Sequence, residues 1–246
     1  MEKIKILSSN QLKILACITM LIDHVGYFLL PQYRILRLIG RLTFPIFAFL
    51  ISEGAKYTKN KLKYLLNVGV LGIIWQVYLI IFRSDYYFNV LITFSISIII
   101  IYAMDYFKKC LFDKNCKVIF KILTFLLFIF VALSPYLIPK VFSWFSYEYG
   151  LYGAMCAVFA SIPVLNKTDA PDYLKWFDKI PIRILCMAVP LFMYSRNRGT
   201  VTIFFFIGLA LIFLYSEKRG KANLKYFFYI FYPAHLLILH LISYLI

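Results

Sequence analysis

Residues 118–138 read VIFKILTFLLFIFVALSPYLI, a run in which Lys121 is the single charged side chain. A helix needs about 20 mainly apolar residues to cross the hydrocarbon of a bilayer. Only helices and closed barrels satisfy their backbone hydrogen bonds there. A barrel strand alternates apolar and polar positions over about 10 residues, whereas this run is longer and continuously apolar. The run therefore predicts a membrane-spanning helix and an all-α fold.

Apolar segments of this kind occur along the whole chain, which is 63% hydrophobic and only 15% charged. Soluble domains carry about 25% charged residues, so the composition excludes a soluble domain, and the hydrophobicity excludes a disordered chain. We therefore predict a polytopic transmembrane helical bundle of about nine spans, forming a single domain over residues 1–246 among membrane lipids. The other eight predicted segments are roughly 11–30, 37–55, 64–82, 88–107, 149–165, 182–194, 200–216 and 226–245.

The positive charges predict the orientation of the chain. The formal net charge is +16, and most of the 27 Lys and Arg residues fall in alternate loops. Cytoplasmic loops of membrane proteins are enriched in Lys and Arg, so nine spans place the N-terminus inside and the C-terminus outside. No basic run lies on a polar scaffold, so we expect no nucleic-acid partner. The five cysteines show no CxxC or Cys/His ligand spacing, so we expect no metal site.

The first predicted span carries three ionisable side chains, Lys13, Asp23 and His24. Such groups are costly in hydrocarbon and therefore indicate a functional site. Eleven residues separate Lys13 from His24, which places both on one helix face about 16 Å apart. Imidazole suits proton transfer near neutral pH. Asp23 points about 100° away from His24, so it either orients the imidazole or pairs with an arginine. The alternative is a structural His–Asp pair that holds helices together.

Arginines mark the outer end of the second predicted span. Arg34, Arg37 and Arg41 share one helical stripe. Arg37 and Arg41, which begin the apolar run, are candidates to recognise a carboxylate or phosphate or to balance the charge of Asp23. Snorkelling to lipid headgroups is the alternative. Farther along this segment, Pro45 predicts a kink or a helix start.

A second intramembrane histidine lies in the last predicted span, in the sequence Tyr232-Pro233-Ala234-His235. His235 is either a partner of His24 across the bundle or a hydrogen-bonded core residue. His240 lies five positions farther on and faces differently, which disfavours a two-histidine metal site within this helix.

Four sequence motifs together resemble the TraX family of integral-membrane acetyltransferases. The combination is more specific than any one of its parts, and it covers both ends of the chain. The motifs are Asp23-His24-Val-Gly26, Gly40-Arg41-Leu-Thr-Phe44-Pro45-Ile-Phe-Ala-Phe49, Glu53-Gly54 and Tyr232-Pro233-Ala234-His235.

The resemblance implies an acetyltransferase of the bacterial cytoplasmic membrane. The donor would be cytoplasmic acetyl-CoA, and the acceptor an amine or hydroxyl of a pilin-like protein, a peptide or a glycan. More distantly, the chain is similar to acyltransferase-3-type membrane enzymes, in which a basic residue and a histidine lie on the first helix, as Lys13 and His24 do here. In this scheme His24 is the general base or takes the acetyl group itself. Arg37 or Arg41 stabilises the oxyanion, and Asp23 and His235 complete the site.

The basic cytoplasmic loops offer an attractive field for the phosphates of acetyl-CoA. Lys13, Lys61 and Lys63 are the candidate contacts, and we assign Glu53 to the same side, although it also has the option of an interfacial pair with Lys56. Two other functions use the same residues. A proton-coupled secondary transporter would use the buried His, Asp and Arg groups, and it predicts inverted repeats that we do not see. A non-catalytic assembly factor would use these charges only to hold helices together.

Overall fold

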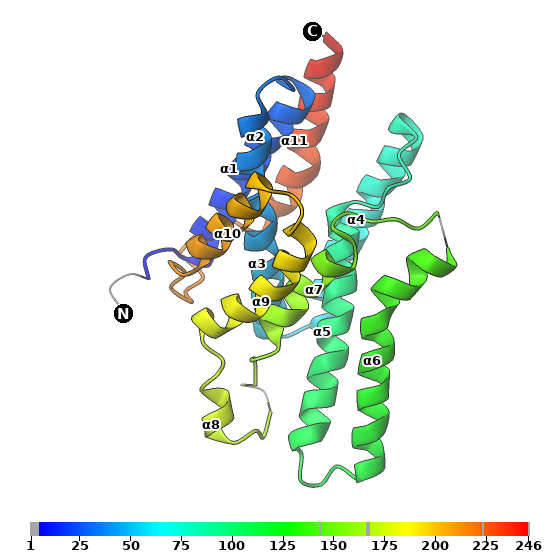
Figure 1. Cartoon of the computed structure of the whole chain (residues 1–246), viewed down its shortest axis with the longest axis vertical. Helices are drawn as coiled ribbons and strands as arrows, with labels where there is room; N and C mark the ends of the chain where they lie inside the picture. Colours follow the sequence, from blue (N-terminus) through cyan, green and yellow to red (C-terminus); the bar gives the residue numbers. More distant parts are fainter. Residues whose placement is uncertain (1–4, 143, 166–167, 223, 246) are drawn as a thin grey trace. The chain divides into compact units, whose positions relative to one another are not determined.

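The computed structural model describes residues 5–142, 144–165, 168–222 and 224–245, and it is helical throughout (Figure 1). In these ranges the strand-like contacts are limited to two isolated bridges, Leu7 with Tyr215 and Phe88 with Tyr147. The all-α prediction is therefore confirmed. The chain forms two compact units, one comprising the residues up to Leu50 and from Leu191 onward, the other Ile51–Pro190.

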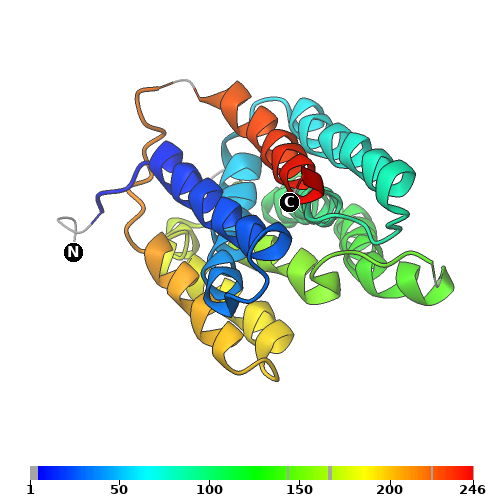
Figure 2. The same ribbon diagram turned by 90° about the horizontal axis from the view of Figure 1, so that it is seen from above.

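The first unit is built around α1 (Ser9–Phe28), which contacts both α2 (Arg34–Gly40) and α11 (Lys225–Leu245) (Figures 1 and 2). A capping box begins α1: the Ser8 side chain accepts from the Gln11 amide, and the Gln11 side chain accepts from the Ser8 amide. These bonds satisfy donors that a helix start otherwise leaves free. The first half of α3 (Thr43–Tyr57) and α10 (Thr200–Ile212) complete the unit.

The predicted segment 37–55 is divided between two helices. The first, α2, ends at Gly40, and α3 begins at Thr43, so Pro45 lies in the first turn of α3. Proline is tolerated there because its missing N–H has no partner in a first turn. The predicted helix start at Pro45 is thus confirmed. Gly208 of α10 lies against this junction, since a Cβ there would be 2.6 Å from Pro45 Cγ and 2.9 Å from the Leu42 carbonyl oxygen.

The second unit is organised around α5 (Val90–Phe112), which contacts three other helices. Ser97 in this helix donates to the Ala154 carbonyl (2.8 Å), and Thr93 donates to the Glu148 carbonyl (2.7 Å). The helices that contact α5 are α4 (Lys61–Arg83), α6 (Val118–Val141) and α7 (Gly150–Ser161). The unit also contains α8 (Asp172–Lys175), the second half of α3 and most of α9 (Ile180–Ser195).

Tyr147 attaches the segment before α7 to α6. Its hydroxyl donates to the Pro135 carbonyl at 2.5 Å. This carbonyl belongs to a helix that contains two prolines, Pro135 and Pro139. Burial raises the pKa of Tyr147 above its ordinary value, so the hydroxyl keeps the proton that this bond requires.

Each of the nine predicted segments contains a helix, and six helical stretches are long and apolar enough to cross a membrane: α1, α2 with α3, α4, α5, α6 and α11. The helices α7, α9 and α10 are apolar but shorter, at 12, 16 and 13 residues. Large apolar side chains on α6 lie exposed, among them Phe130 at 70%, as expected for a helix surrounded by lipid. The count of nine spans, the orientation and the single domain stay predictions.

Candidate active site

His24 of α1 and His235 of α11 meet within the first unit. His24 Nδ1 and His235 Nε2 lie 3.0 Å apart, and the ring centroids lie 5.0 Å apart. His235 is buried, and His24 is half-buried. The structure shows both features that the sequence offered as alternatives for His235: it contacts His24, and it is a buried residue bonded to the Phe231 carbonyl.

The hydrogen bonds of His235 determine which nitrogen atoms carry protons. His235 Nδ1 lies 2.6 Å from the Phe231 carbonyl oxygen. A carbonyl only accepts, so Nδ1 must be the donor, and in a neutral ring Nε2 is then the acceptor. His24 Nδ1 must therefore donate to His235 Nε2. A neutral His24 consequently carries its lone pair on Nε2, which is the form that a general base requires.

Aromatic rings hold the histidine pair in place. Phe231 stacks on His235 with ring centroids 4.7 Å apart and planes inclined by 13°. Tyr232 meets the same ring edge-on, and Phe28 lies 6.3 Å from the His24 ring. These contacts restrict how far either imidazole can rotate, so the orientation of the lone pair on His24 is determined by packing.

Asp23 pairs with an arginine. Arg37 Nη1 donates to Asp23 Oδ2 at 2.7 Å and to the Asp23 backbone carbonyl at 3.3 Å. The guanidinium of Arg37 also lies 5.0 Å from the centre of the Tyr27 ring. Arg41 caps the end of α2, and its charge acts on both Asp23 and His24. The predicted residues Asp23, His24, Arg37, Arg41 and His235 are thus all in the first unit.

Gly40 makes room for the Asp23 carboxylate. A Cβ at Gly40 would lie 2.1 Å from Asp23 Oδ1 and 2.2 Å from Asp23 Cβ. Among the described residues Asp23 Oδ1 has no hydrogen-bond partner. Gly26 similarly permits close approach of α1 and α2, because its Cβ would lie 2.7 Å from Leu36 Cβ. Two glycines of the sequence motifs therefore allow the helix contact that positions Asp23.

Replacing Gly40 by alanine is expected to displace Asp23 and break its bond to Arg37. Overpacking of this kind costs about 1–3 kcal/mol of unfolding free energy. We expect thermal unfolding of the purified protein to shift downward. Gly69→Ala is the matched control, because a Cβ there would meet Ser95 Oγ at an ordinary 3.5 Å. Equal unfolding temperatures for the two variants would contradict the steric role of Gly40.

The residues that the sequence predicts to bind acetyl-CoA are divided between the two units. Lys13 lies in the first unit, with its ammonium 5.3 Å from the Phe228 ring centre. Lys61 and Lys63 begin α4 in the second unit, where the Asn60 side chain caps the helix by accepting from the Lys63 amide (2.8 Å). Glu53 is also in the second unit, where it is buried and pairs with Arg183.

Glu53 belongs to a buried group of four charges. Arg183 donates to Glu53 and, at 2.9 Å each, to Ser52 Oγ and the Ala160 carbonyl. Lys56 pairs with Asp178 at 2.8 Å. Sequence reasoning missed Arg183 and Asp178, because they lie more than 120 positions from their partners and nothing local marks them as partners.

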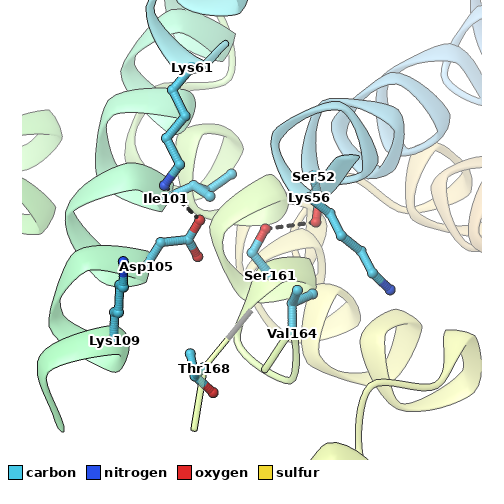
Figure 3. Close-up of a pocket in the computed structure, with 9 residues that line it drawn as sticks. All are labelled: Ser52, Lys56, Lys61, Ile101, Asp105, Lys109, Ser161, Val164 and Thr168. Atoms are coloured by element: carbon cyan, nitrogen blue, oxygen red, sulfur yellow. Dashed lines mark hydrogen bonds and ion pairs between the residues drawn. The ribbon is translucent and has the colours of Figure 1, made fainter. Parts of the chain in front are cut away.

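A pocket lies at one end of the second unit (Figure 3). Lys61 lines it and points along α5 toward Asp105, with Nζ 3.3 Å from Asp105 Oδ2. Lys63 is not among the lining residues. The lining residues are Ser52, Lys56, Lys61, Ile101, Asp105, Lys109, Ser161, Val164 and Thr168. Within the described ranges, no group of three or more His, Cys, Asp and Glu side chains is placed to hold a metal ion.

Comparisons with known proteins agree with the sequence motifs. The family model described as TraX protein matches residues 8–243. A probable fimbrial assembly protein, FimC of serogroup H1 from Dichelobacter nodosus, is 25% identical over 94% of both chains. An uncharacterised protein of Rickettsia prowazekii is 36% identical over 40% of this chain and 37% of its own length. No solved structure matches. Because the family match covers nearly the whole chain, this protein belongs to the TraX family.

Proposed function

We propose that this protein is an integral-membrane acetyltransferase. It would move an acetyl group from cytoplasmic acetyl-CoA to an amine or hydroxyl of an acceptor at the membrane. The observation that carries the proposal is the contact between His24 and His235, in which a neutral His24 donates through Nδ1 and so has its lone pair on Nε2. Membership of the TraX family supports the same chemistry.

In the proposed reaction, His24 Nε2 accepts the proton of the acceptor amine or hydroxyl as its nitrogen or oxygen attacks the thioester carbonyl. The tetrahedral intermediate collapses, the carbon–sulfur bond breaks, and the proton on His24 passes to the leaving thiolate to give CoA. His235 Nε2 accepts from His24 Nδ1 and so stabilises the charged imidazole. Arg41 or Arg37 stabilises the oxyanion. Alternatively, Nε2 takes the acetyl group itself.

The acceptor that we propose to test first is a pilin-like protein. The relative from Dichelobacter nodosus is named as a probable fimbrial assembly protein, and it matches this chain over nearly its full length. Peptides and glycans are the next acceptors to test, because the proposed base acts equally on an amine and a hydroxyl.

The test is acetyl-CoA binding and hydrolysis by the full chain purified in detergent, since water can replace an absent acceptor. We expect saturable binding and slow release of the CoA thiol. Absence of binding at millimolar acetyl-CoA would overturn the proposal. Proton-coupled uptake into proteoliposomes in that case would support the transporter that the buried His, Asp and Arg groups also suggest.

A further inference from the structure

The pocket of the second unit forms where four helix ends meet. Ser52 and Lys56 lie near the end of α3, Lys61 begins α4, Lys109 lies near the end of α5, and Ser161 ends α7. With the predicted orientation, all four ends face the cytoplasm. The cavity encloses about 180 Å³. This volume leaves room for a phosphate group.

Lysine ammonium groups are the hydrogen-bond donors available to a ligand in this pocket. Lys61 bonds Asp105, and Lys56 bonds Asp178. An ammonium has three donor hydrogens, so Lys61 retains donors after its ion pair, whereas the Lys56 ammonium points away from the other lining side chains (Figure 3). Lys109 is exposed, and in the described part of the chain it has no ion-pair or hydrogen-bond partner. Lys56 and Lys61 are each balanced by an aspartate, so the charge of Lys109 makes the pocket net positive.

The hydroxyl groups in the wall have already used their hydrogens. Ser161 Oγ donates to the Ala157 carbonyl (3.0 Å), so in the 2.7 Å contact between the two serines Ser52 must be the donor (Figure 3). Thr168 Oγ1 donates to the Leu165 carbonyl (2.7 Å). Among the described lining residues, the side-chain donors left for a ligand are therefore those of the lysines, and a group with several negatively charged oxygen atoms satisfies them best.

A buried lysine outside the pocket fixes one of its walls. Lys108 Nζ donates to the backbone carbonyls of Ser161 (2.7 Å) and Val164 (3.3 Å). These bonds satisfy carbonyls at the end of α7 that the helix leaves free. These bonds hold in place the backbone at the end of α7, which forms one wall of the pocket.

We propose that this pocket binds the phosphate groups at the nucleotide end of the acyl donor, with Lys109 and Lys61 as the principal contacts. The assignment rests on the proposed acetyltransferase function. It adds Lys109 to the donor site, and it places Lys63 and Glu53 outside that site. An anionic lipid headgroup offers the same phosphate chemistry from a different source, and the test separates the two.

The test compares Lys109→Gln with Lys114→Gln in the purified full chain. Lys114 lies in the loop just after α5 and does not line the pocket, so its variant removes the same charge nearby. Isothermal titration with CoA and with adenosine 3′,5′-bisphosphate, which lacks the pantetheine arm, measures affinity. We expect Lys109→Gln to weaken both ligands about tenfold, as for the loss of one hydrogen bond between charged groups. We expect Lys114→Gln to change them less than twofold. Equal affinities for the two variants would overturn the proposal.

Binding measured in lipid nanodiscs tests whether the phosphate in the pocket comes from a lipid headgroup. If association of phosphatidylglycerol, compared with phosphatidylcholine alone, depends on Lys109 while the affinity for CoA is the same in the wild type and in Lys109→Gln, the pocket holds a headgroup and the donor assignment is overturned. Failure of the proposed function is distinguishable. In that case adenosine 3′,5′-bisphosphate binds in a Lys109-dependent way, but no acetyl group is transferred.

Discussion

His24→Ala is expected to lower acetyl-CoA hydrolysis by about 10²- to 10⁴-fold, the range for removal of a general base, while the protein stays folded. The reason is that Nε2 of His24 carries the lone pair, as the hydrogen bonds of His235 require. Release of the CoA thiol measures the rate, and thermal unfolding of the same preparation measures folding.

Two substitutions of His235 serve as the controls. His235→Gln retains a carbonyl oxygen that can accept from His24 Nδ1, whereas His235→Leu does not. We expect the glutamine variant to keep more activity than the leucine variant. Normal hydrolysis by His24→Ala would contradict the assignment of the base. A loss of activity matched by an equal loss of thermal stability would instead favour the assembly-factor function, in which these residues only hold helices together.

Arg183→Met is expected to lower the free energy of unfolding by about 3–5 kcal/mol, because it leaves the Glu53 carboxylate buried without its partner. The Arg183 side chain is only 2% exposed and contacts Glu53, Ser52 and the Ala160 carbonyl. Unfolding in detergent, followed by helical circular dichroism against increasing denaturant, measures the change.

The exposed pair of Lys175 and Asp172 provides the matched control. Asp172 is 98% exposed, so we expect Lys175→Met to cost less than about 1 kcal/mol. Combining Arg183→Met with Glu53→Gln removes both charges and should recover part of the lost stability. If Arg183→Met unfolds like the wild type, the buried pair contributes nothing to the fold.

The fold class could be predicted from the sequence because hydrocarbon permits few backbone structures. The continuous apolar run of residues 118–138 excludes a strand by length alone, and it forms α6. Pro45 predicts a kink or a helix start from its own ring geometry, and it lies in the first turn of α3. The short helices α7, α9 and α10 show the limit of such reasoning, because hydropathy identifies an apolar segment but not whether its helix crosses the membrane.

The individual side chains of the site could be predicted better than their partners. The cost of ionisable groups in a membrane identified His24, Asp23 and Arg37 from the sequence. The contact between His24 and His235 joins positions 211 residues apart, so the sequence offered it only as one of two alternatives.

The basic residues at the pocket show a different limit. Lys63 and Lys109 are both lysines near a helix end, yet only Lys109 lines the pocket. Which of them does so depends on the rotation of α4 and α5 about their axes. That rotation follows from the packing of α5 against its neighbours, which the composition of a loop does not reveal.

The ion pair of Asp23 and Arg37 has a consequence for membrane insertion. An aspartate or an arginine at the centre of a spanning helix costs about 2.5–3.5 kcal/mol during insertion at the translocon. Asp23 and Arg37 are only 14 positions apart, on consecutive helices that pack through Gly26 and Gly40. We therefore expect α1 and α2 to leave the translocon together as a hairpin. Its two charges would then enter the lipid as a neutral pair.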